Sequence, residues 1–265
     1  MALVLFSSLE VVSKPIMDQV TPFTVTFLRF FIGGLFLFLI SKRNIRGRDL
    51  FSIILIGSLN CIVSMTLLQL SVKYGNASSA ATLISTSPMF TAFFAAYIIQ
   101  EHLSLKKKFG IALGLFGIIV FGFGMLEGDT LAGILFGVAA SVTFALYSVL
   151  MKKHVAKYGA VNCTAYSTLF PSLIYGTGLL VTGNLTIPDV GIKGWLIILY
   201  LGIFVTGVAY YSLLESVNRM GASMAMRLFY VKPVLATLLA FSMLNEPFGL
   251  VKLMGMGIII FSLTL

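Results

Sequence analysis

The sequence predicts an all-α integral membrane protein with ten transmembrane helices, arranged as two inverted repeats of five helices. Three observations lead to this class. Of the 265 residues, 58% are hydrophobic and only 10% are charged, whereas a soluble domain carries about 25% charged residues. Apolar runs of about 20 residues, the length that crosses the hydrocarbon core, follow one another along the whole chain. The second half of the chain also repeats the first at a fixed offset.

The first five predicted helices are separated only by short charged or turn-forming segments, such as residues 42–49. The first run contains Lys14 and lacks a small-residue cleavage site, so we expect a retained helix rather than a signal peptide. The second run carries Arg29, and the fourth carries Pro88. These runs cover residues 1–17, 22–41, 50–72, 78–99 and 108–126.

The second five helices follow the short segment 127–130, which leaves no room for a soluble domain between the halves. The ninth run carries Lys232 and Pro233 near its middle. We therefore expect the two repeats to occupy residues 1–126 and 131–265. The runs of the second repeat cover residues 131–151, 162–182, 195–214, 222–244 and 250–265.

The distribution of Lys and Arg between alternate loops predicts the orientation. Basic residues are retained on the cytoplasmic side, so the loops that hold most of them face the cytoplasm, and both termini do too. On this topology a cysteine at position 45 is labelled from the cytoplasm and one at position 128 from outside. The even loops contain Lys42, Arg43, Arg46, Arg48, Lys106, Lys107, Lys108, Lys152, Lys153, Lys157 and Arg219, whereas the odd loops contain Lys14, Lys73, Lys193 and Lys252.

The internal repeat appears when the chain is shifted against itself so that position 88 falls on position 233. Matching Pro, Glu, Lys and Gly are harder to obtain by chance than matching Leu, and a unit with an odd number of crossings inverts its second copy. The fourth and fifth helices therefore correspond to the ninth and tenth. The matched pairs include Pro88 with Pro233, Glu101 with Glu246, Lys107 with Lys252 and Gly110 with Gly255.

These features together resemble the EamA family of the drug/metabolite transporter superfamily over essentially the whole chain. The resemblance depends on the two repeats of five spans, Ser-Lys-Pro at residues 13–15, Leu28-Arg29, and the repeated Pro and Glu described above. It implies a multi-pass carrier or exporter of small metabolites in a bacterial cytoplasmic membrane, with a central cavity between inverted repeats. Lys232 and Glu10 depart from the commoner family pattern, so the resemblance implies no particular substrate.

Four charged residues lie deep inside predicted spans, where each needs a partner, an aqueous cavity or access to the interface. One of them, Arg227, lies about 7 Å from the cytoplasmic end of its run, so we expect its long side chain to reach the interface. Glu10 and Arg29 lie at similar depths, roughly 12 and 10 Å from the outer boundary at 1.5 Å per residue. Either they form an ion pair that locks the first two helices, or they act in binding and coupling. Lys232 is the eleventh residue of its run and lies near the midplane. It either binds backbone carbonyls or holds an anionic group of a substrate.

Two prolines are expected to interrupt helices beside this site. Pro233 has no amide hydrogen and crowds the carbonyl of Phe229, and Pro88 does the same to Ile84. Broken helices of this kind surround the binding sites of transporters. We therefore predict that Glu10, Arg29, Pro88 and Pro233 act in coupling or gating, with Glu10 pairing Lys232 in the empty protein and Arg29 competing for Glu10.

Neutral polar side chains at similar depths complete the predicted binding site, although an ordinary helix contact explains most such groups. No catalytic residue, metal site or cofactor is expected, because His102 and His154 lack ligands at metal spacing and no phosphate-binding Gly-rich loop is present. The predicted substrate-binding residues are Lys232, Glu10, Ser7, Ser8, Ser64, Ser85, Tyr147 and Tyr230.

The predicted function is that of a secondary-active exporter or exchanger of small metabolites, such as amino acids, working by alternating access. Its expected partners are the bilayer, an anionic or zwitterionic small molecule and protons, without nucleic acid, in a monomer or homodimer. One alternative is a flippase for a lipid or lipid-linked sugar, which would have a lateral opening between helices. Another is a membrane enzyme or scaffold that transports nothing.

Overall fold

A computed structural model describes residues 2–42, 44–100, 104–124, 128–185, 189–226, 229, 231–246 and 249–265, with the side chains of Lys107 and Gly122 left aside. Within this part of the chain every element is a helix. The elements follow the apolar runs of the sequence. In order they are α1 (Ala2–Ser13), η1 (Lys14–Ile16), α2 (Pro22–Ile40), α3 (Gly47–Ser58), η2 (Leu59–Ser64), α4 (Met65–Tyr74), α5 (Ala77–Ile84), α6 (Ser87–Ile98), α7 (Leu105–Phe123), α8 (Leu131–Tyr158), α9 (Ala160–Val181), α10 (Gly191–Tyr200), η3 (Leu201–Ala209), α11 (Tyr210–Met220), α12 (Ala222–Ala225), α13 (Lys232–Leu244) and α14 (Leu250–Leu263).

Five helical stretches in the described part are long and apolar enough to cross a membrane. They confirm the expected all-helical membrane protein, while the full set of ten spans stays a prediction. Large apolar side chains such as Leu39, Phe123 and Val181 are also more than three-quarters exposed on the outside of the bundle. The five stretches are Pro22–Ile40, Gly47–Tyr74, Ala77–Ile98, Leu131–Tyr158 and Gly191–Met220, and the shorter apolar helices are Lys108–Phe121, Lys232–Leu244 and Leu250–Leu263.

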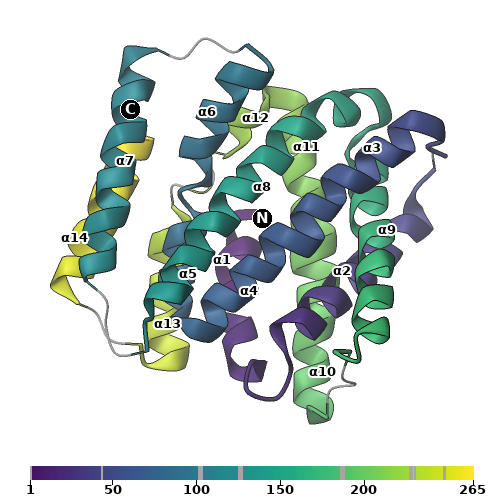
Figure 1. Ribbon diagram of the computed structural model, residues 1–265, viewed down its shortest axis with the longest axis horizontal. Coiled ribbons are helices and arrows are strands. Elements are labelled where there is room, and N and C mark those ends of the chain that lie inside the picture. Colours follow the sequence, from purple (N-terminus) through teal and green to yellow (C-terminus); the bar gives the residue numbers. More distant parts are fainter. Residues whose placement is uncertain are drawn as a thin grey trace.

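The helices form a bundle in which α8 packs against α4, α5 and α6, while α2 packs between α9 and η3. At one edge α7 and α14 lie along each other, on the left in Figure 1. In the middle, α1 contacts both α13 and η3. The first helix of the chain therefore meets elements from the last third of the sequence, which determines where its polar side chains end up.

Both predicted helix interruptions occur. In the first half, α5 ends at Ile84 and α6 begins at Ser87, with Pro88 in its first turn. The carbonyl of Ile84, which Pro88 has no amide hydrogen to bond, accepts a hydrogen bond from Ser87 Oγ at 2.5 Å. In the second half, α13 begins at Lys232 with Pro233 in its first turn.

The starts of three helices repeat at the offset found in the sequence. Helices α5, α6 and α7 begin at Ala77, Ser87 and Leu105. Moved by this offset, these positions fall on Ala222, Lys232 and Leu250, where α12, α13 and α14 begin. Two π-helical segments also correspond, because η2 moved by the same offset falls within η3. π-Helical turns are rare and frequently occur at functional sites.

Candidate functional site

A buried ion pair lies at the centre of the bundle. Lys232 Nζ donates a hydrogen bond to Glu10 Oε1 at 2.6 Å, and the two side chains are 1% and 0% exposed. Lys232 is the first residue of α13, so the interruption of the helix places its side chain against α1. Among the described residues, the second oxygen of Glu10, Oε2, has no hydrogen-bond partner. The pair is thus closed off from solvent but leaves one carboxylate oxygen able to accept a further donor.

Arg29 is fully buried on α2. Thr21 caps this helix by accepting a hydrogen bond from the Thr24 amide at 3.2 Å, and Pro22 supplies the preset φ of its first turn. Arg29 Nε donates to Thr206 Oγ1 at 3.2 Å and Nη2 lies 3.5 Å from Met65 Sδ, whereas Nη1 has no hydrogen-bond partner in the described part of the chain. The considered ion pair between Arg29 and Glu10 is not found among the described contacts, because Glu10 bonds Lys232 instead.

The neighbours of Arg29 come from the two π-helical segments. Thr206 belongs to η3 and its hydroxyl bonds the carbonyl of Leu201, five residues earlier. Asn60 belongs to η2 and is fully buried, and neither of its amide atoms makes a hydrogen bond of normal geometry to a described residue. The Tyr210 hydroxyl interacts with the side chains of Arg29 and Asn60. This interaction does not give Nη1 of Arg29 or the amide atoms of Asn60 a hydrogen bond of normal geometry.

Aromatic rings connect the two charged sites. The Tyr210 ring centroid lies 5.3 Å from that of Phe6 and 5.7 Å from that of Phe30. Arg29 Cζ is 5.2 Å from the Phe30 centroid, and Lys232 Nζ is 5.6 Å from that of Phe229. The aromatic cluster consists of Phe6, Phe30, Phe144, Tyr147, Tyr210 and Phe229, all buried.

The predicted neutral site residues differ in what their side chains contact. Tyr147 joins the aromatic cluster, stacked on Phe144 at 6.1 Å. Ser8 lies 2.7 Å from the Tyr200 hydroxyl. The other hydroxyls bond backbone carbonyls: Ser7 that of Leu3, Ser64 that of Ala140 and Ser85 that of Ala81. Tyr230 and Arg227 lie outside the described residues.

Sequence reasoning did not single out six residues of the site, namely Thr206, Met65, Phe6, Phe30, Phe144 and Phe229. Only Thr206 left a signal, since it is the one hydroxyl in the apolar run 201–209. The phenylalanines are 4 of 23 in the chain, so composition could not distinguish them. Their role depends on which rings the helix packing brings together.

A second polar cluster joins the two halves at the end of the bundle assigned to the outside. Asp129 accepts hydrogen bonds from Ser79 Oγ at 2.6 Å and from Lys252 Nζ at 3.0 Å. Burial opposes the charged form of Asp129, but these donors and Lys252 outweigh it and lower the pKa of the carboxyl. Glu246 accepts from the Ala77 amide at 2.7 Å and from Ser78 Oγ at 2.6 Å, at the start of α5.

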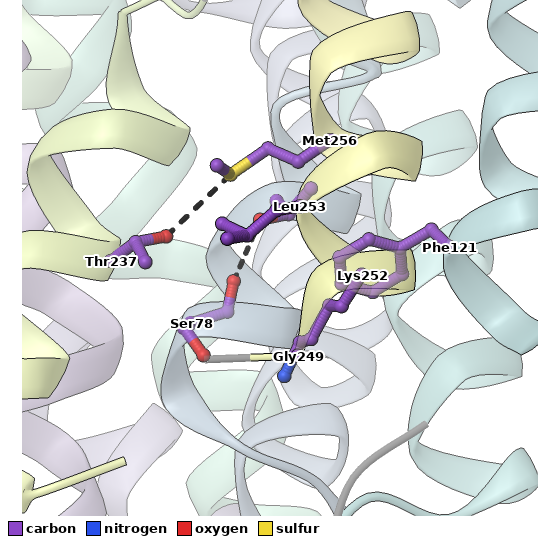
Figure 2. Close-up of a pocket in the computed structure, with 8 residues that line it drawn as sticks. Ser78, Phe121, Thr237, Gly249, Lys252, Leu253 and Met256 are labelled. Atoms are coloured by element: carbon purple, nitrogen blue, oxygen red, sulfur yellow. Dashed lines mark hydrogen bonds between the residues drawn. The ribbon is translucent and has the colours of Figure 1, made fainter. Parts of the chain in front are cut away.

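Two pockets adjoin these clusters. Figure 2 shows the small one, in which Ser78 of α5, Thr237 of α13 and Lys252 of α14 converge. The larger one is a lateral groove between α1 and α13, one helical turn from Glu10 and Lys232. It is lined by Val4, Ser7, Leu235, Leu238, Leu239 and Ser242. Across the described ranges, His, Cys, Asp and Glu side chains form no group of three that could hold a metal ion.

Comparison with known proteins extends over the whole chain. The model of the EamA-like transporter family matches residues 1–123 and 131–265. An uncharacterized transporter of Clostridium kluyveri is 30% identical, with 97% of this chain and 88% of the relative covered. The uncharacterized transporter YdfC of Bacillus subtilis is 28% identical, with 90% and 79% covered. A solved crystal structure with 21% identity has a TM-score of 0.75 and covers 99% of this chain and 92% of its own.

Proposed function

The chain belongs to the EamA-like transporter family, and we propose that it is a secondary-active carrier that exports or exchanges a small polar or amphipathic metabolite, such as an amino acid, by alternating access. The observation that carries this proposal is the buried pair of Lys232 and Glu10. Both charges lie in a region that lipid or protein shields from water, where an ionisable group is expensive and marks a substrate or ion pathway.

The pair suits a coupling element because it joins two helices that are far apart in sequence. Protonation of Glu10, or arrival of an anionic group at Lys232, weakens the contact between α1 and α13. The interruptions at Pro88 and Pro233 leave short helices that can move separately from their neighbours. A carrier needs such a contact that holds in one state and opens in another.

The common offset between helix starts, and the matching π-helical segments, support two equivalent halves of five spans each. Since five crossings invert the second half, the halves are proposed to be related by a twofold axis in the membrane plane. On this proposal the membrane is the bacterial cytoplasmic membrane and both termini face the cytoplasm, an orientation that the basic loops favour. Inverted halves around a shared polar site are the usual architecture for alternating access.

Counterflow into vesicles tests the proposal. Purified protein is reconstituted, a panel of amino acids and organic acids is assayed with and without a proton gradient, and Lys232→Met is compared with Arg219→Gln, a control in which an exposed ion pair with Glu215 is lost. We expect Lys232→Met to abolish flux and the control to transport normally. Glu10→Gln should alter proton dependence more than substrate affinity. Normal flux and affinity in Lys232→Met would make Lys232 a structural ion.

A flippase is the second candidate, because a mostly apolar groove is lined by residues of α1 and α13, one helical turn along each helix from Glu10 and Lys232. The same vesicles are prepared with a fluorescent phospholipid, and an impermeant reductant is added outside. Flippase activity increases the fraction of label that the reductant bleaches, compared with vesicles that lack the protein. An unchanged fraction excludes phospholipid movement. A protein that moves neither solutes nor lipid would favour the enzyme or scaffold alternative.

A further inference from the structure

The charges at the centre of the bundle do not balance among the described residues. Glu10 contributes one negative charge, and Lys232 and Arg29 contribute two positive charges, all at most 1% exposed. Lys232 bonds Glu10 directly, whereas the described side-chain contacts of Arg29 are all with uncharged groups, among them the Thr206 hydroxyl and the Met65 thioether. A buried charge without a counter-ion is costly. The surplus positive charge therefore belongs to Arg29 and matches one missing anion.

The unpaired donors beside Arg29 suit a carboxylate. Within the described part of the chain, Nη1 of Arg29 and Nδ2 of Asn60 are buried and make no hydrogen bond of normal geometry, and the Tyr210 hydroxyl interacts with both side chains. A carboxylate has two oxygens that accept about four hydrogen bonds and fits the planar guanidinium. The other two guanidinium nitrogens of Arg29 face the Thr206 hydroxyl and the Met65 thioether, and a thioether is a weak acceptor.

The surroundings of these donors are apolar. Phe30 adjoins Arg29, and Tyr210 contacts Phe30, Phe6 and Phe144 within 6.1 Å between centroids. Such rings contribute large apolar areas that pack against an uncharged body. Glu10 lies within electrostatic range of Arg29 and disfavours a second negative charge. The site thus combines one anion position with an apolar wall.

We propose that Arg29 is the anchor for the carboxylate of the transported molecule, and that this molecule is a small amphipathic monocarboxylate whose apolar part packs against the aromatic cluster. This inference rests on the proposed carrier function and names its substrate class. It gives Lys232 and Glu10 the coupling role and moves the anion from Lys232, where the sequence suggested it, to Arg29. The anion is assigned to Arg29 because Lys232 already has a carboxylate partner, Glu10.

Matched ligands test the carboxylate without any mutation. The purified full chain in detergent micelles is titrated calorimetrically with 3-phenylpropionate, its neutral analogue 3-phenylpropionamide, and propionate, which lacks the ring. A hydrogen bond to a charged group contributes about 1.5–3 kcal/mol, so the amide should bind roughly 10- to 100-fold more weakly than the acid. Propionate should also bind more weakly than 3-phenylpropionate. Equal affinities for acid and amide, or binding of none of the three, would overturn the proposal.

Variants then assign the preference to Arg29. Arg29→Gln should bind acid and amide equally, Arg29→Lys should retain part of the preference, and Arg219→Gln, changed at an exposed arginine, should keep all of it. Size-exclusion chromatography checks that each variant is folded. If Arg29→Gln is not folded, Arg29→Lys takes its place in the comparison. A full acid preference in folded Arg29→Gln contradicts the inference.

The transport assay separates this inference from the proposed function. Binding of 3-phenylpropionate that depends on Arg29, without flux of any solute, would support the site and refute the carrier. Flux of other solutes that 3-phenylpropionate does not inhibit would support the carrier and refute the proposed substrate class.

Discussion

Glu10 and Lys232 each sit where an isolated charge could not be tolerated. Loss of flux in Lys232→Met alone does not distinguish lost coupling from lost stability. Because the structure pairs the two side chains at 2.6 Å, removing one partner leaves the other buried and uncompensated. A clean functional test of Lys232 therefore needs a second change at Glu10 to restore the balance of charge.

This pairing predicts the stability of three variants. Glu10→Gln should lower the free energy of unfolding by about 3–5 kcal/mol, the usual cost of breaking a buried ion pair. The double variant Glu10→Gln, Lys232→Met should recover most of that loss, since it removes both charges. Thermal unfolding in micelles measures the difference. If the double variant loses as much as the sum of the two single variants, the two side chains do not act as a pair.

At the scale of the element, the position of Arg29 depends on the close approach of α2 to η3. A Cβ atom added at Gly33 would lie 2.4 Å from the carbonyl oxygen of Gly202 and 2.9 Å from the amide nitrogen of Gly207. Both are backbone atoms and cannot turn aside as a flexible side chain would. Gly33 therefore permits the contact that brings Arg29 to Thr206.

Gly33→Ala should consequently destabilise the protein by about 1–3 kcal/mol, as overpacking of a tight contact does, and weaken any ligand bound at Arg29. Gly178→Ala is the matched control, because a Cβ at this position in α9 meets nothing within 4 Å. Unfolding temperatures and titrations of the two variants measure the effect. Equal behaviour of the two would show that α2 and η3 have room to separate.

For the whole molecule, the proposed topology is tested by cysteine labelling from either side of the membrane. The structure changes the positions chosen from the sequence: Ile45 is only 1% exposed, and Gly128 has a φ of +89° that strains any other residue. Two exposed residues replace them, namely Arg46, next to Ile45, and Asn184, in another loop assigned to the outside. Arg46→Cys should react from the cytoplasm and Asn184→Cys from outside.

The unchanged protein is the control for labelling, since both native cysteines, Cys61 and Cys163, are buried. An impermeant maleimide applied to intact cells should therefore modify only Asn184→Cys, and Arg46→Cys should react after the membrane is opened. Labelling of both variants in intact cells would contradict an odd number of crossings between these positions.

The sequence by itself determined the class of the protein, the helix interruptions and the repeat. Hydropathy and the missing amide of proline are local properties, so Pro88 and Pro233 predicted helix breaks without knowledge of the neighbours. The repeat offset was visible in matched residues and recurs in the helix starts. Glu10, Arg29 and Lys232 were recognised because charge inside an apolar run is itself a signal.

Only the tertiary structure decided how these residues combine. The sequence allowed Glu10 to pair with either Lys232 or Arg29, and the structure shows the pair with Lys232, near the other end of the chain, rather than with Arg29 on the next helix. That choice depends on the rotation of each helix about its axis and on packing across the bundle, which depth along the sequence does not specify. The π-helical segments and the aromatic cluster likewise arise from contacts between distant helices, because a phenylalanine in an apolar helix has no local feature that distinguishes a site from a core.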